Sequence, residues 1–414
     1  HRVDRRQRQM CIRDRVNNKI MSDCFLFIRN GKSVKQNPDA NGIPITRIET
    51  IADKSIDINR LGYANIDINN IGSLENYLLK EGDILMSHIN SPKHLGKTAI
   101  YQNQPVHLIH GMNLLCLRTK KDICDSNYAN YYFQSSLFLQ NLAQISNKSV
   151  NQASFSVGRL KDLEIPLPPL KNQKQIASIL DNAAALRDKT AQLLKEYDLL
   201  AQSIFLEMFG DPVKNPKSWK IEKLNNLCGV GSSRRVFVSE LVESGIPFYR
   251  GKEIGALSTG EVINPDLFIT QEHYDSLGEA TGVPAIGDLL MPSICPDGRI
   301  YRVQDNEPFY FKDGRVLWIK VNQENINSYY LIFFLRELFR TSYSNIASGT
   351  TFAELKIVAL KKIKTLVPPI NLQNQFAEKI ALIEQQKALA KQELQESENL
   401  FNCLLQKAFK GELV

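Results

Sequence analysis

Apolar side chains recur three and four residues apart in two long stretches of the chain, which is the spacing of a heptad seam. The first seam runs through Ile176, Ile179, Ala183, Leu186, Thr190, Leu193, Tyr197, Leu200 and Ile204. The second runs through Ile380, Ile383, Ala390, Leu394, Phe401, Leu404 and Ala408, with Lys387 and Ser397 as polar interruptions. Each seam predicts a helix of roughly 34 residues and about 50 Å, so we expect the two helices to pair as an antiparallel coiled coil.

A pair of prolines precedes each predicted helix, within a segment that the chain contains twice. Residues 165–177 (IPLPPLKNQKQIA) align with residues 365–377 (TLVPPINLQNQFA) at an offset of 200, and the alignment runs without a gap to Phe209 and Phe409. The shared positions are Pro168 and Pro368, Pro169 and Pro369, Gln173 and Gln373, Gln175 and Gln375, and Ala177 and Ala377. Tandem proline favours extended backbone and cannot continue a helix. We therefore expect two stiff joints, and the sequence leaves open whether the glutamines cap the helices or contact a partner.

Four further blocks repeat in the same order. They are GIPITR (42–47) with GIPFYR (245–250), GDILMS (82–87) with GDLLMPS (287–293), HGMNLLCLR (110–118) with DGRVLWIK (313–320), and NYANYYF (127–133) with SYYLIFF (328–334). Their offsets drift by a few residues, as differences in loop length would produce. Collinear matches of this kind indicate that the chain is a tandem duplication.

The segment before each joint has the pattern of a mixed α/β domain. The runs GIPITRI, DILMSHI and NLLCLRT are short, branched and bounded by Gly, Pro or Asn, which is typical of strands. Aromatic residues at helical spacing around 126–143 and 326–343 predict helices that pack in the cores. The expected fold class is α+β: two mixed α/β domains separated by two long helices that pair as an antiparallel coiled coil, with a pseudo-twofold internal repeat.

The repeat also predicts the domain boundaries. We place a first globular domain at 16–164, a central proline joint and helix at 165–210, a second globular domain at 211–364, and a C-terminal joint and helix at 365–414. Residues 1–15 are unlike everything that follows, and their stretch MCIRDR resembles a translated sequencing adapter. We interpret this segment as non-native, and the other interpretation is a basic arm that grips nucleic acid.

The net charge gives little guidance about the partner of the protein. Residues 1–15 contain six Arg and two Asp, so they supply +4 of the formal charge of +7 and leave only +3 for the rest of the chain. With 414 residues, 43% hydrophobic and 23% charged, the sequence has the composition of a folded protein of two to three domains. No apolar run reaches the ~20 residues that cross a bilayer, and no secretory signal is visible. The seven cysteines are scattered, as expected of a cytoplasmic protein.

No catalytic motif emerges from the sequence. The stretch LGKT (95–98) resembles the end of a phosphate loop, but Ser91 stands where its first glycine should be. The chain has no GxGxxG motif for a dinucleotide or methyl donor. The cysteines form no CxxC pair and no histidines cluster beside them, so we expect no metal site. We assign no catalytic residue.

Basic and polar loops at equivalent places in both halves are the remaining candidates for function. Arg, Lys, Asn, Gln, Ser and Thr are the side chains that hold phosphates and read base edges. The candidate DNA-binding residues are Arg29, Lys32, Lys35, Arg47, Lys93, Lys97, Asn151, Gln152 and Ser154 in the first half, and Arg234, Arg235, Arg250, Lys252, Arg299, Thr350 and Thr351 in the second. Each alone also fits a solvated surface, and their recurrence favours a paired binding surface.

The order of these motifs resembles the DNA-specificity subunits of Type I restriction–modification systems. The resemblance rests on IPLPPLKNQKQIA, a helix ending in SIFLEMFGDP, the second joint VPPINLQNQFA and a helix ending in LLQKAFKGEL, and it covers essentially residues 16–414. It implies two target-recognition domains, each reading one half of a bipartite site in double-stranded DNA. The helix pair would set the spacing between the half-sites and dock two methyltransferase subunits. The spacer or partner positions would be Pro168, Pro169, Gln173, Gln175, Pro368, Pro369, Gln373 and Gln375.

The resemblance further implies a non-catalytic subunit that binds no cofactor itself. S-adenosylmethionine would belong to the partner methyltransferase, and ATP and Mg to the partner restriction subunits, which are helicase–nucleases. A stiff spacer suits such a protein, because a duplex repeats every ~34 Å and its half-sites must be held at a fixed phase.

Other classes of function stay open on the sequence. A close variant is the recognition half of a Type IIB-like or otherwise reassembled system. A coiled-coil scaffold with two protein-binding domains would show no salt-sensitive binding to duplex DNA. A stand-alone enzyme would transfer methyl groups or cleave DNA as a purified chain.

Overall fold

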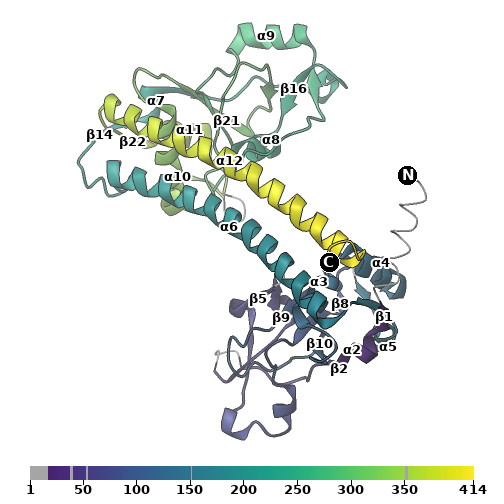
Figure 1. The fold of residues 1–414 in the computed structure, drawn as a ribbon. Helices are drawn as coiled ribbons and strands as arrows, with labels where there is room; N and C mark the ends of the chain where they lie inside the picture. Colours follow the sequence, from purple (N-terminus) through teal and green to yellow (C-terminus); the bar gives the residue numbers. More distant parts are fainter. Residues whose placement is uncertain (1–16, 38–40, 53–54, 151, 350–352) are drawn as a thin grey trace. The chain divides into compact units, whose positions relative to one another are not determined.

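The computed structural model describes residues 17–37, 41–52, 55–150, 152–349 and 353–414 (Figure 1). The chain divides into two compact units: unit 1 ends at Ala191 and resumes at Gln392–Val414, and unit 2 is Gln192–Lys391. This division cuts through both long helices, α6 (Leu170–Phe209) and α12 (Ile370–Phe409), so each unit contains part of each helix. The domain boundaries expected from the repeat, which give each helix a segment of its own, stay predictions.

Each unit is built on a four-stranded antiparallel sheet with the same strand order. In unit 1 the order is β2 (Phe25–Asn30), β10 (Leu114–Thr119), β7 (Ile84–Ser87) and β9 (Thr98–Ile100). In unit 2 it is β15 (Cys228–Gly231), β21 (Val316–Val321), β18 (Leu289–Pro292) and β19 (Tyr301–Arg302). The identical order confirms the internal repeat, which the sequence blocks had predicted.

The central strands are largely apolar because both faces of each sheet are covered. Along β7, Ile84 and Met86 belong to one core cluster and Leu85 to another. The same alternation appears along β18, where Leu290 faces away from the cluster that contains Leu289. Successive side chains of a strand point to opposite faces, so a strand buried on both sides reads as a continuous apolar run.

Helices rich in aromatic residues contribute to the core on one side of each sheet, as predicted. In unit 2 the segment is one helix, α10 (Ser328–Ile346). In unit 1 it is two, α3 (Ser126–Tyr132) and α4 (Ser136–Ile145). The break follows from Ser135, whose hydroxyl accepts the backbone N–H of Phe138 and begins a new helix. The aromatic side chains are buried and confirmed as core: Tyr128, Tyr132, Phe138, Tyr330, Phe334 and Phe339.

Small ribbons complete each unit. The strands that lead into the helices pair in equivalent ways, β1 (Asn17–Ile20) with β13 (Glu164–Leu167) and β14 (Lys220–Lys223) with β22 (Lys364–Val367). The other elements of unit 1 are α2 (Met21–Cys24), β3 (Ile43–Ile45), β4 (Ile51–Ala52), β5 (Ser55–Ile56), β6 (Gly62–Ala64), β8 (Ile89–Asn90), β11 (Asn147–Lys148), β12 (Ala153–Ser154), α5 (Val157–Lys161) and the 3₁₀ turns η1 (Ile48–Thr50), η2 (Ile58–Arg60), η3 (Ile68–Asn70), η4 (Gly72–Tyr77) and η5 (Pro92–His94). Those of unit 2 are α7 (Leu224–Leu227), η6 (Val238–Glu240), β16 (Ile246–Tyr249), α8 (Gly251–Ser258), β17 (Phe268–Ile269), α9 (Gln271–Thr281), β20 (Tyr310–Phe311) and α11 (Ile357–Lys361).

Both long helices begin immediately after the tandem prolines. The carbonyl oxygen of Pro169 accepts the backbone N–H groups of Asn172 and Gln173 at 2.8 and 3.1 Å, and Pro369 does the same for the second helix. Each helix has 40 residues, against roughly 34 expected, which corresponds to about 60 Å. The prediction was short because it counted from the first seam residue, whereas each helix begins directly after the second proline of its joint.

The helices pair in antiparallel fashion within each unit. The core of unit 1 includes Leu180, near the start of α6, together with Phe401 and Leu405, near the end of α12. The core of unit 2 includes Phe209 at the end of α6 and Phe376 near the start of α12. Because the start of one helix meets the end of the other in both units, the two helices run in opposite directions.

The predicted seam is only partly correct. Ile176, Ala183, Ile380 and Ile383 are buried, but Leu186 and Leu200 are 45% and 47% exposed. Thr190 of the first seam is buried, and so is Ser397, which interrupts the second seam. Their hydroxyls donate to carbonyl oxygens of their own helix, at 3.1 Å to Leu186 and 2.8 Å to Leu394, which satisfies them without a partner.

Within the described part of the chain, no helix combines the length and the apolar character needed to cross a membrane.

Candidate nucleic-acid interface

A surface cleft of about 210 Å³ in unit 1 brings together two of the predicted basic loops. The cleft is lined by Lys32, Ser33, Val34, Gln36, Ile45, Thr46, Arg47, Ile48, Glu49, Met112 and Asn113. Three chain segments therefore meet here: the one after β2, the one after β3, and the one before β10. Lys32 and Arg47, which the sequence placed in separate loops, lie in one site.

Backbone hydrogen bonds hold the three segments together. The N–H of Met112 donates to the carbonyl oxygen of Lys32 at 3.1 Å, and the N–H of Thr46 donates to that of Ile109 at 3.0 Å. Gly111 permits the close approach, because a Cβ at this position would lie 2.1 Å from the carbonyl oxygen of Thr46. Backbone hydrogen bonds thus fix the positions of the three segments, and with them the positions from which the side chains of the cleft extend.

Arg47 is a well-anchored basic side chain of the cleft. Its Nε donates to Oε1 of Gln36 at 2.7 Å, and its Nη1 lies 4.0 Å from Oε1 of Glu49. Its backbone N–H donates to the hydroxyl of Thr50 at 2.7 Å, which begins the turn η1. The side chain is 40% exposed, so the guanidinium is both positioned and accessible.

Arg29, another predicted DNA-binding residue, does not line the cleft. Its guanidinium lies over the rings of Phe27 and Tyr77, at 4.2 and 4.8 Å from their centroids, and donates to the carbonyl oxygen of Asn76. Arg29 and Phe27 point to the same face of β2 because side chains alternate along a strand. Arg29 therefore packs unit 1 together through cation–π contacts.

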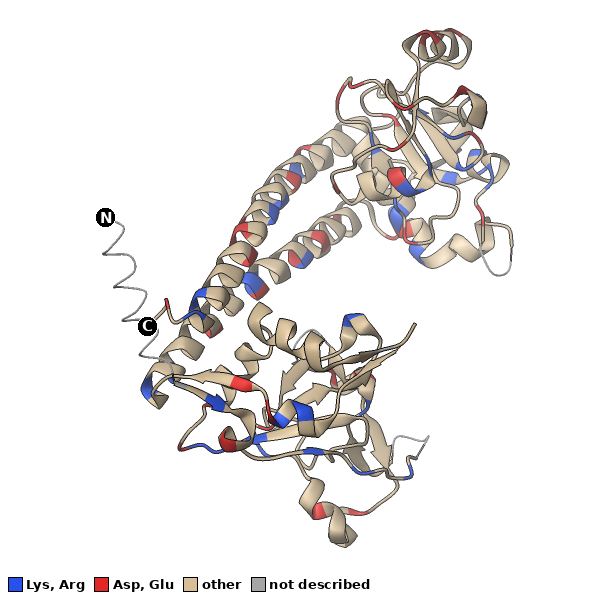
Figure 2. Ribbon diagram, turned by 90° about the vertical axis from the view of Figure 1, so that its right-hand side faces the viewer, with Lys and Arg blue, Asp and Glu red and all other residues tan. Residues whose placement is uncertain are grey.

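The four candidate lysines of unit 1 are all exposed: Lys32, Lys35, Lys93 and Lys97. Among the described residues, none of these ammonium groups has a hydrogen-bond or ion-pair partner. Figure 2 shows basic residues on the loops and strands of both units, and basic and acidic residues interspersed along the long helices. Free exposed lysines can hold phosphates without breaking an internal contact.

The segment that contains Lys93 and Lys97 and the segment that contains Gln152 and Ser154 also come together. Strand β8 pairs with β12, so that Ile89 lies opposite Ser154. Lys93 follows on η5, and Lys97 precedes β9. Gln152 is exposed beside β12, whereas Asn151 falls outside the described residues.

In unit 2, carboxylates neutralise most of the candidate arginines. Arg250 contacts Glu253 at 2.8 Å and Asp266 at 2.9 Å. Hydrogen bonding to Glu253, ahead of that to Asp266, raises the pKa of Arg250 above its ordinary value. Arg299 pairs with Asp297 at 2.8 Å and Arg235 with Asp313 at 3.4 Å.

The other candidate residues of unit 2 that the structure describes are not paired with a described carboxylate. Arg234 and Lys252 are exposed, and their side chains have no hydrogen-bond or ion-pair partner within the part of the chain that the structure describes. Thr350 and Thr351 lie outside the described residues.

The repeated glutamines of the two joints differ in exposure. Gln173 and Gln373 are 1% and 0% exposed. Oε1 of Gln173 accepts the backbone N–H of Asp125, and its Nε2 donates to the carbonyl oxygens of Ile123 and Pro168. The amide of Gln173 thus forms its hydrogen bonds with backbone groups of this chain. Gln175 and Gln375 are exposed, and a contact of these two with a partner subunit stays a prediction.

The prolines act in the same joint. Nε2 of Gln373 donates to the carbonyl oxygen of Pro368 at 2.8 Å, as Gln173 does to that of Pro168. Oε1 of Gln373 accepts the backbone N–H of Asn327 at 2.9 Å. Each buried amide thus fastens the proline joint to the start of a core helix, α3 or α10.

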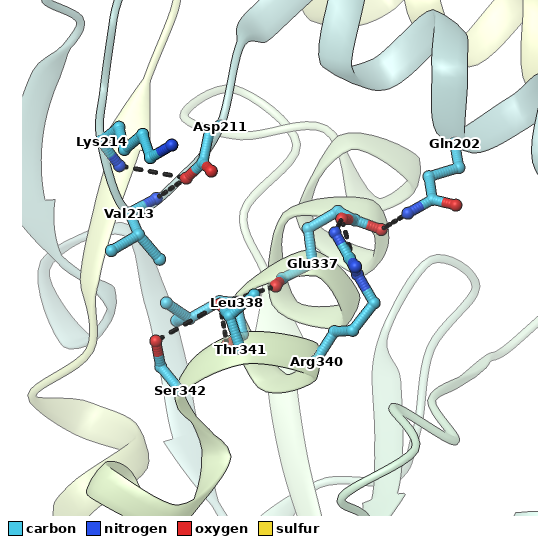
Figure 3. Close-up of polar contacts among 9 residues, drawn as sticks. All are labelled: Gln202, Asp211, Val213, Lys214, Glu337, Leu338, Arg340, Thr341 and Ser342. Atoms are coloured by element: carbon cyan, nitrogen blue, oxygen red, sulfur yellow. Dashed lines mark hydrogen bonds and ion pairs between the residues drawn. The ribbon is translucent and has the colours of Figure 1, made fainter.

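A polar cluster fixes the end of α6 against α10 in unit 2 (Figure 3). Gln202 of α6 donates to Oε1 of the buried Glu337 at 2.8 Å, and Arg340 donates to its Oε2 at 2.9 Å. Beyond α6, Oδ1 of Asp211 accepts the backbone N–H groups of Val213 and Lys214. The bond from Lys214 is the main reason that the pKa of Asp211 is lowered. These contacts are internal, and they explain the FGDP turn as the end of a helix.

Sequence reasoning missed several residues of the cleft, among them Gln36, Thr46, Met112 and Asn113. Thr46, Met112 and Asn113 lie in the repeated blocks GIPITR and HGMNLLCLR, where only the basic and strand-forming residues indicated a role, whereas Gln36 lies outside the repeated blocks. Among the described residues, no three His, Cys, Asp or Glu side chains gather as a metal site.

Two stretches of the chain, residues 17–196 and 216–399, match the family described as the Type I restriction modification DNA specificity domain. The chain belongs to this family. The two matches correspond to the two copies of the internal repeat.

Members of the family resemble the chain along most of its length. The putative type I restriction enzyme MjaX specificity subunit of Methanocaldococcus jannaschii is 31% identical, over 93% of this chain and 91% of that protein. The type I restriction enzyme EcoKI specificity subunit of Escherichia coli K12 is 24% identical, over 82% of this chain and 76% of that protein.

Solved structures share the fold. The S subunit of a Type I restriction–modification system from M. genitalium has a TM-score of 0.57 at 15% identity, over 95% of this chain and 96% of its own. A chain from a study of complex assembly and conformational transition of the type I R-M system has a TM-score of 0.56 at 15% identity, over 96% and 98%. The family's fold is therefore the fold of this chain.

Proposed function

We propose that this chain is the DNA-recognition subunit of a Type I restriction–modification complex, and that each unit reads one half of a bipartite target. One observation carries the proposal: the family match occurs twice, on two units with the same strand order. The cleft of unit 1, with Lys32 and Arg47, supplies the chemistry for phosphate and base contacts. Because the loops of the two units differ in sequence, the two half-sites differ.

The two long helices set the distance between the half-sites and dock two methyltransferase subunits. Their length supports the spacer role, since 40 continuous helical residues make a stiff element. Their exposed apolar side chains support docking, because a partner subunit that covered them would remove apolar surface from water. These are Leu186, Leu199, Leu200, Leu382, Leu389 and Leu400.

The chemistry belongs to the partners in this proposal. The methyltransferase subunits hold S-adenosylmethionine, and the helicase–nuclease restriction subunits hold ATP and Mg. This chain directs them to DNA and has no catalytic residue of its own. The assembled complex works in the cytoplasm, where the DNA is.

The test uses the complex of this chain with its partner methyltransferase. Methylome sequencing of a host that expresses both is expected to show one bipartite motif with a fixed spacer. Binding of the purified complex to a duplex with that motif is expected to weaken steeply with salt, because phosphate contacts release counterions.

Three results would contradict the proposal. Methylation by the purified chain alone would make it an enzyme. A methylated motif without two separated halves would contradict the proposal that each unit reads one half-site. Salt-insensitive or absent binding to duplex DNA would favour the scaffold, which predicts that outcome.

A further inference from the structure

The two copies of the repeat place an arginine at the same structural position, Arg47 in unit 1 and Arg250 in unit 2. Both end the block GIPxxR and follow a short strand, β3 or β16. Both donate their backbone N–H to a side chain three residues on, Thr50 at 2.7 Å and Glu253 at 2.9 Å, and thereby begin a helical turn. Their side chains are similarly exposed, at 40% and 38%. The surroundings of the two guanidinium groups, however, differ.

Arg250 is enclosed by negative charge. Its Nη2 contacts Oε1 of Glu253 at 2.8 Å and both carboxylate oxygens of Asp266 at 2.9 and 3.1 Å, and its Nε donates to Glu253 at 3.1 Å. One cation with two carboxylates leaves a local charge of −1, which repels phosphate. Arg250 stabilises unit 2 by joining α8 to the segment before β17.

Arg47 has most of its donors free. Its Nε is engaged by the neutral amide of Gln36, and Nη1 is 4.0 Å from Glu49, beyond hydrogen-bond distance. Among the described residues, Nη1 and Nη2 make no hydrogen bond. Lys32 lines the same cleft, so two cations face one carboxylate and the local charge is +1. The side of the guanidinium that carries two parallel N–H groups is therefore available to a ligand.

Gly62 leaves the space in which the side chains of Arg47 and Gln36 lie. A Cβ at Gly62 would lie 2.3 Å from Oε1 of Gln36, 2.5 Å from Nε of Arg47 and 2.9 Å from its Nη2. Any larger residue would displace the pair, so the guanidinium rests directly on the main chain of β6. A side chain held in place before binding loses little conformational freedom on binding.

We propose that Arg47 reads a guanine in the half-site of unit 1, donating from Nη1 and Nη2 to O6 and N7 in the major groove. Gln36 and Gly62 position the guanidinium for this contact. Two convergent acceptors on one base edge match the two free donors, and arginine to guanine is the commonest specific contact of this type. The assignment rests on the proposed function and deepens it by naming the base and the residue that reads it.

The experiment measures binding of the complex with the partner methyltransferase to a set of duplexes. The set contains the target found by methylome sequencing and every single base-pair substitution in its two halves. Arg47→Ala is expected to lose discrimination at one G·C pair, by roughly 5- to 150-fold, and to keep it at all other pairs. Arg47→Lys is expected to lose the same discrimination while retaining charge, because an ammonium lacks the fork. Gly62→Ala is expected to weaken discrimination at the same pair.

Matched variants separate this contact from simple charge effects. Lys32→Ala is expected to weaken binding to all duplexes by a similar factor and to reduce the salt dependence. Arg250→Ala is expected to lower the melting temperature of unit 2 and to leave discrimination unchanged at every pair. Thermal melting of each variant checks that unit 1 is folded.

Uniform weakening of all duplexes by Arg47→Ala and Arg47→Lys would make Arg47 a phosphate contact and overturn the assignment. Unchanged discrimination in both variants would also overturn it. Failure of the proposed function looks different, because the unsubstituted complex would then discriminate at no base pair.

Discussion

At the scale of single residues, a buried glutamine at the start of each long helix joins that helix to the domain before it. The amide of Gln373 accepts from Asn327 and donates to Pro368, and the side chain is out of contact with water. Removing a buried partner leaves the remaining group unpaired, which costs more than the bond itself contributes. The joint therefore depends on a neutral side chain rather than on the prolines alone.

Replacing Gln373 by alanine is expected to lower the free energy of unfolding of unit 2 by about 2–3 kcal/mol, since it leaves the N–H of Asn327 unpaired. Thermal or denaturant unfolding of the full chain measures the effect. Gln375→Ala is the matched control, because Gln375 is exposed, and its effect is expected within about 0.5 kcal/mol. Equal losses in both variants would contradict the role assigned to Gln373.

A second residue-scale feature is His110, which is 1% exposed and lies in the segment that precedes Met112 of the unit 1 cleft. Its Nε2 lies 2.8 Å from the carbonyl oxygen of Leu114, to which the neutral ring donates. Burial lowers the pKa of His110 from its ordinary 6.5 to about 4. The folded chain therefore keeps the ring neutral where the unfolded chain protonates it.

Unit 1 is expected to lose stability as the pH falls from about 6.5 to about 4, because the unfolded state binds the proton first. The loss contributed by His110 approaches about 3 kcal/mol at the lower limit and is absent above about pH 7. Melting temperature against pH measures it. His110→Gln is expected to flatten the profile in this window, whereas His107→Gln, at an exposed position, is expected to leave it unchanged. An identical profile for His110→Gln would refute the prediction.

At the scale of elements, the two long helices contribute to the core of each unit and also run from one unit into the other. Their ends are core elements of the units, through Phe205 and Phe209 in unit 2 and Phe401 and Phe409 in unit 1. Lys387 of α12 joins the helices in unit 2 by contacting Asp198 of α6 at 2.7 Å. A change of helix length between these anchors therefore alters the connection between the units without entering either core.

Insertion of four residues near Leu193 of α6, about one helical turn, together with four at the corresponding point of α12, is expected to change the spacer length of the methylated motif. The bases of the half-sites are expected to stay the same, because both units are intact. Methylome sequencing reads both properties. The control is Lys195→Gln, an exposed substitution at the same place, for which the original spacer is expected. An unchanged spacer length in the variant with both insertions would show that the helices do not set the spacing.

At the scale of the whole molecule, one chain supplies two versions of the same unit. The sheets share a strand order, and both joints use the same glutamine. The loops differ: unit 2 has the helices α8 and α9 where unit 1 has short 3₁₀ turns. The two units thus share their sheet and their proline joint, and they differ in the loops that carry the candidate DNA-binding residues.

Replacing residues 16–160 by the equivalent domain of another family member is expected to change one half of the methylated motif and to preserve the other half. The reason is that the contacts of the cleft all lie within unit 1. Methylome sequencing of the chimaera with the same methyltransferase decides it. A change in both halves would show that the two units do not read DNA independently.

The sequence by itself determined the duplication, the two long helices and their proline starts, the main strands and the aromatic core. Each of these depends on local chemistry or periodic spacing, which a linear sequence displays. The tertiary structure decided which polar groups are free. Arg29 and Lys32 are three residues apart, yet one lies against two rings and the other lines the cleft. The partners that distinguish Arg47 from Arg250, and Gln173 from Gln175, come largely from other segments of the chain, so only folding brings them within reach.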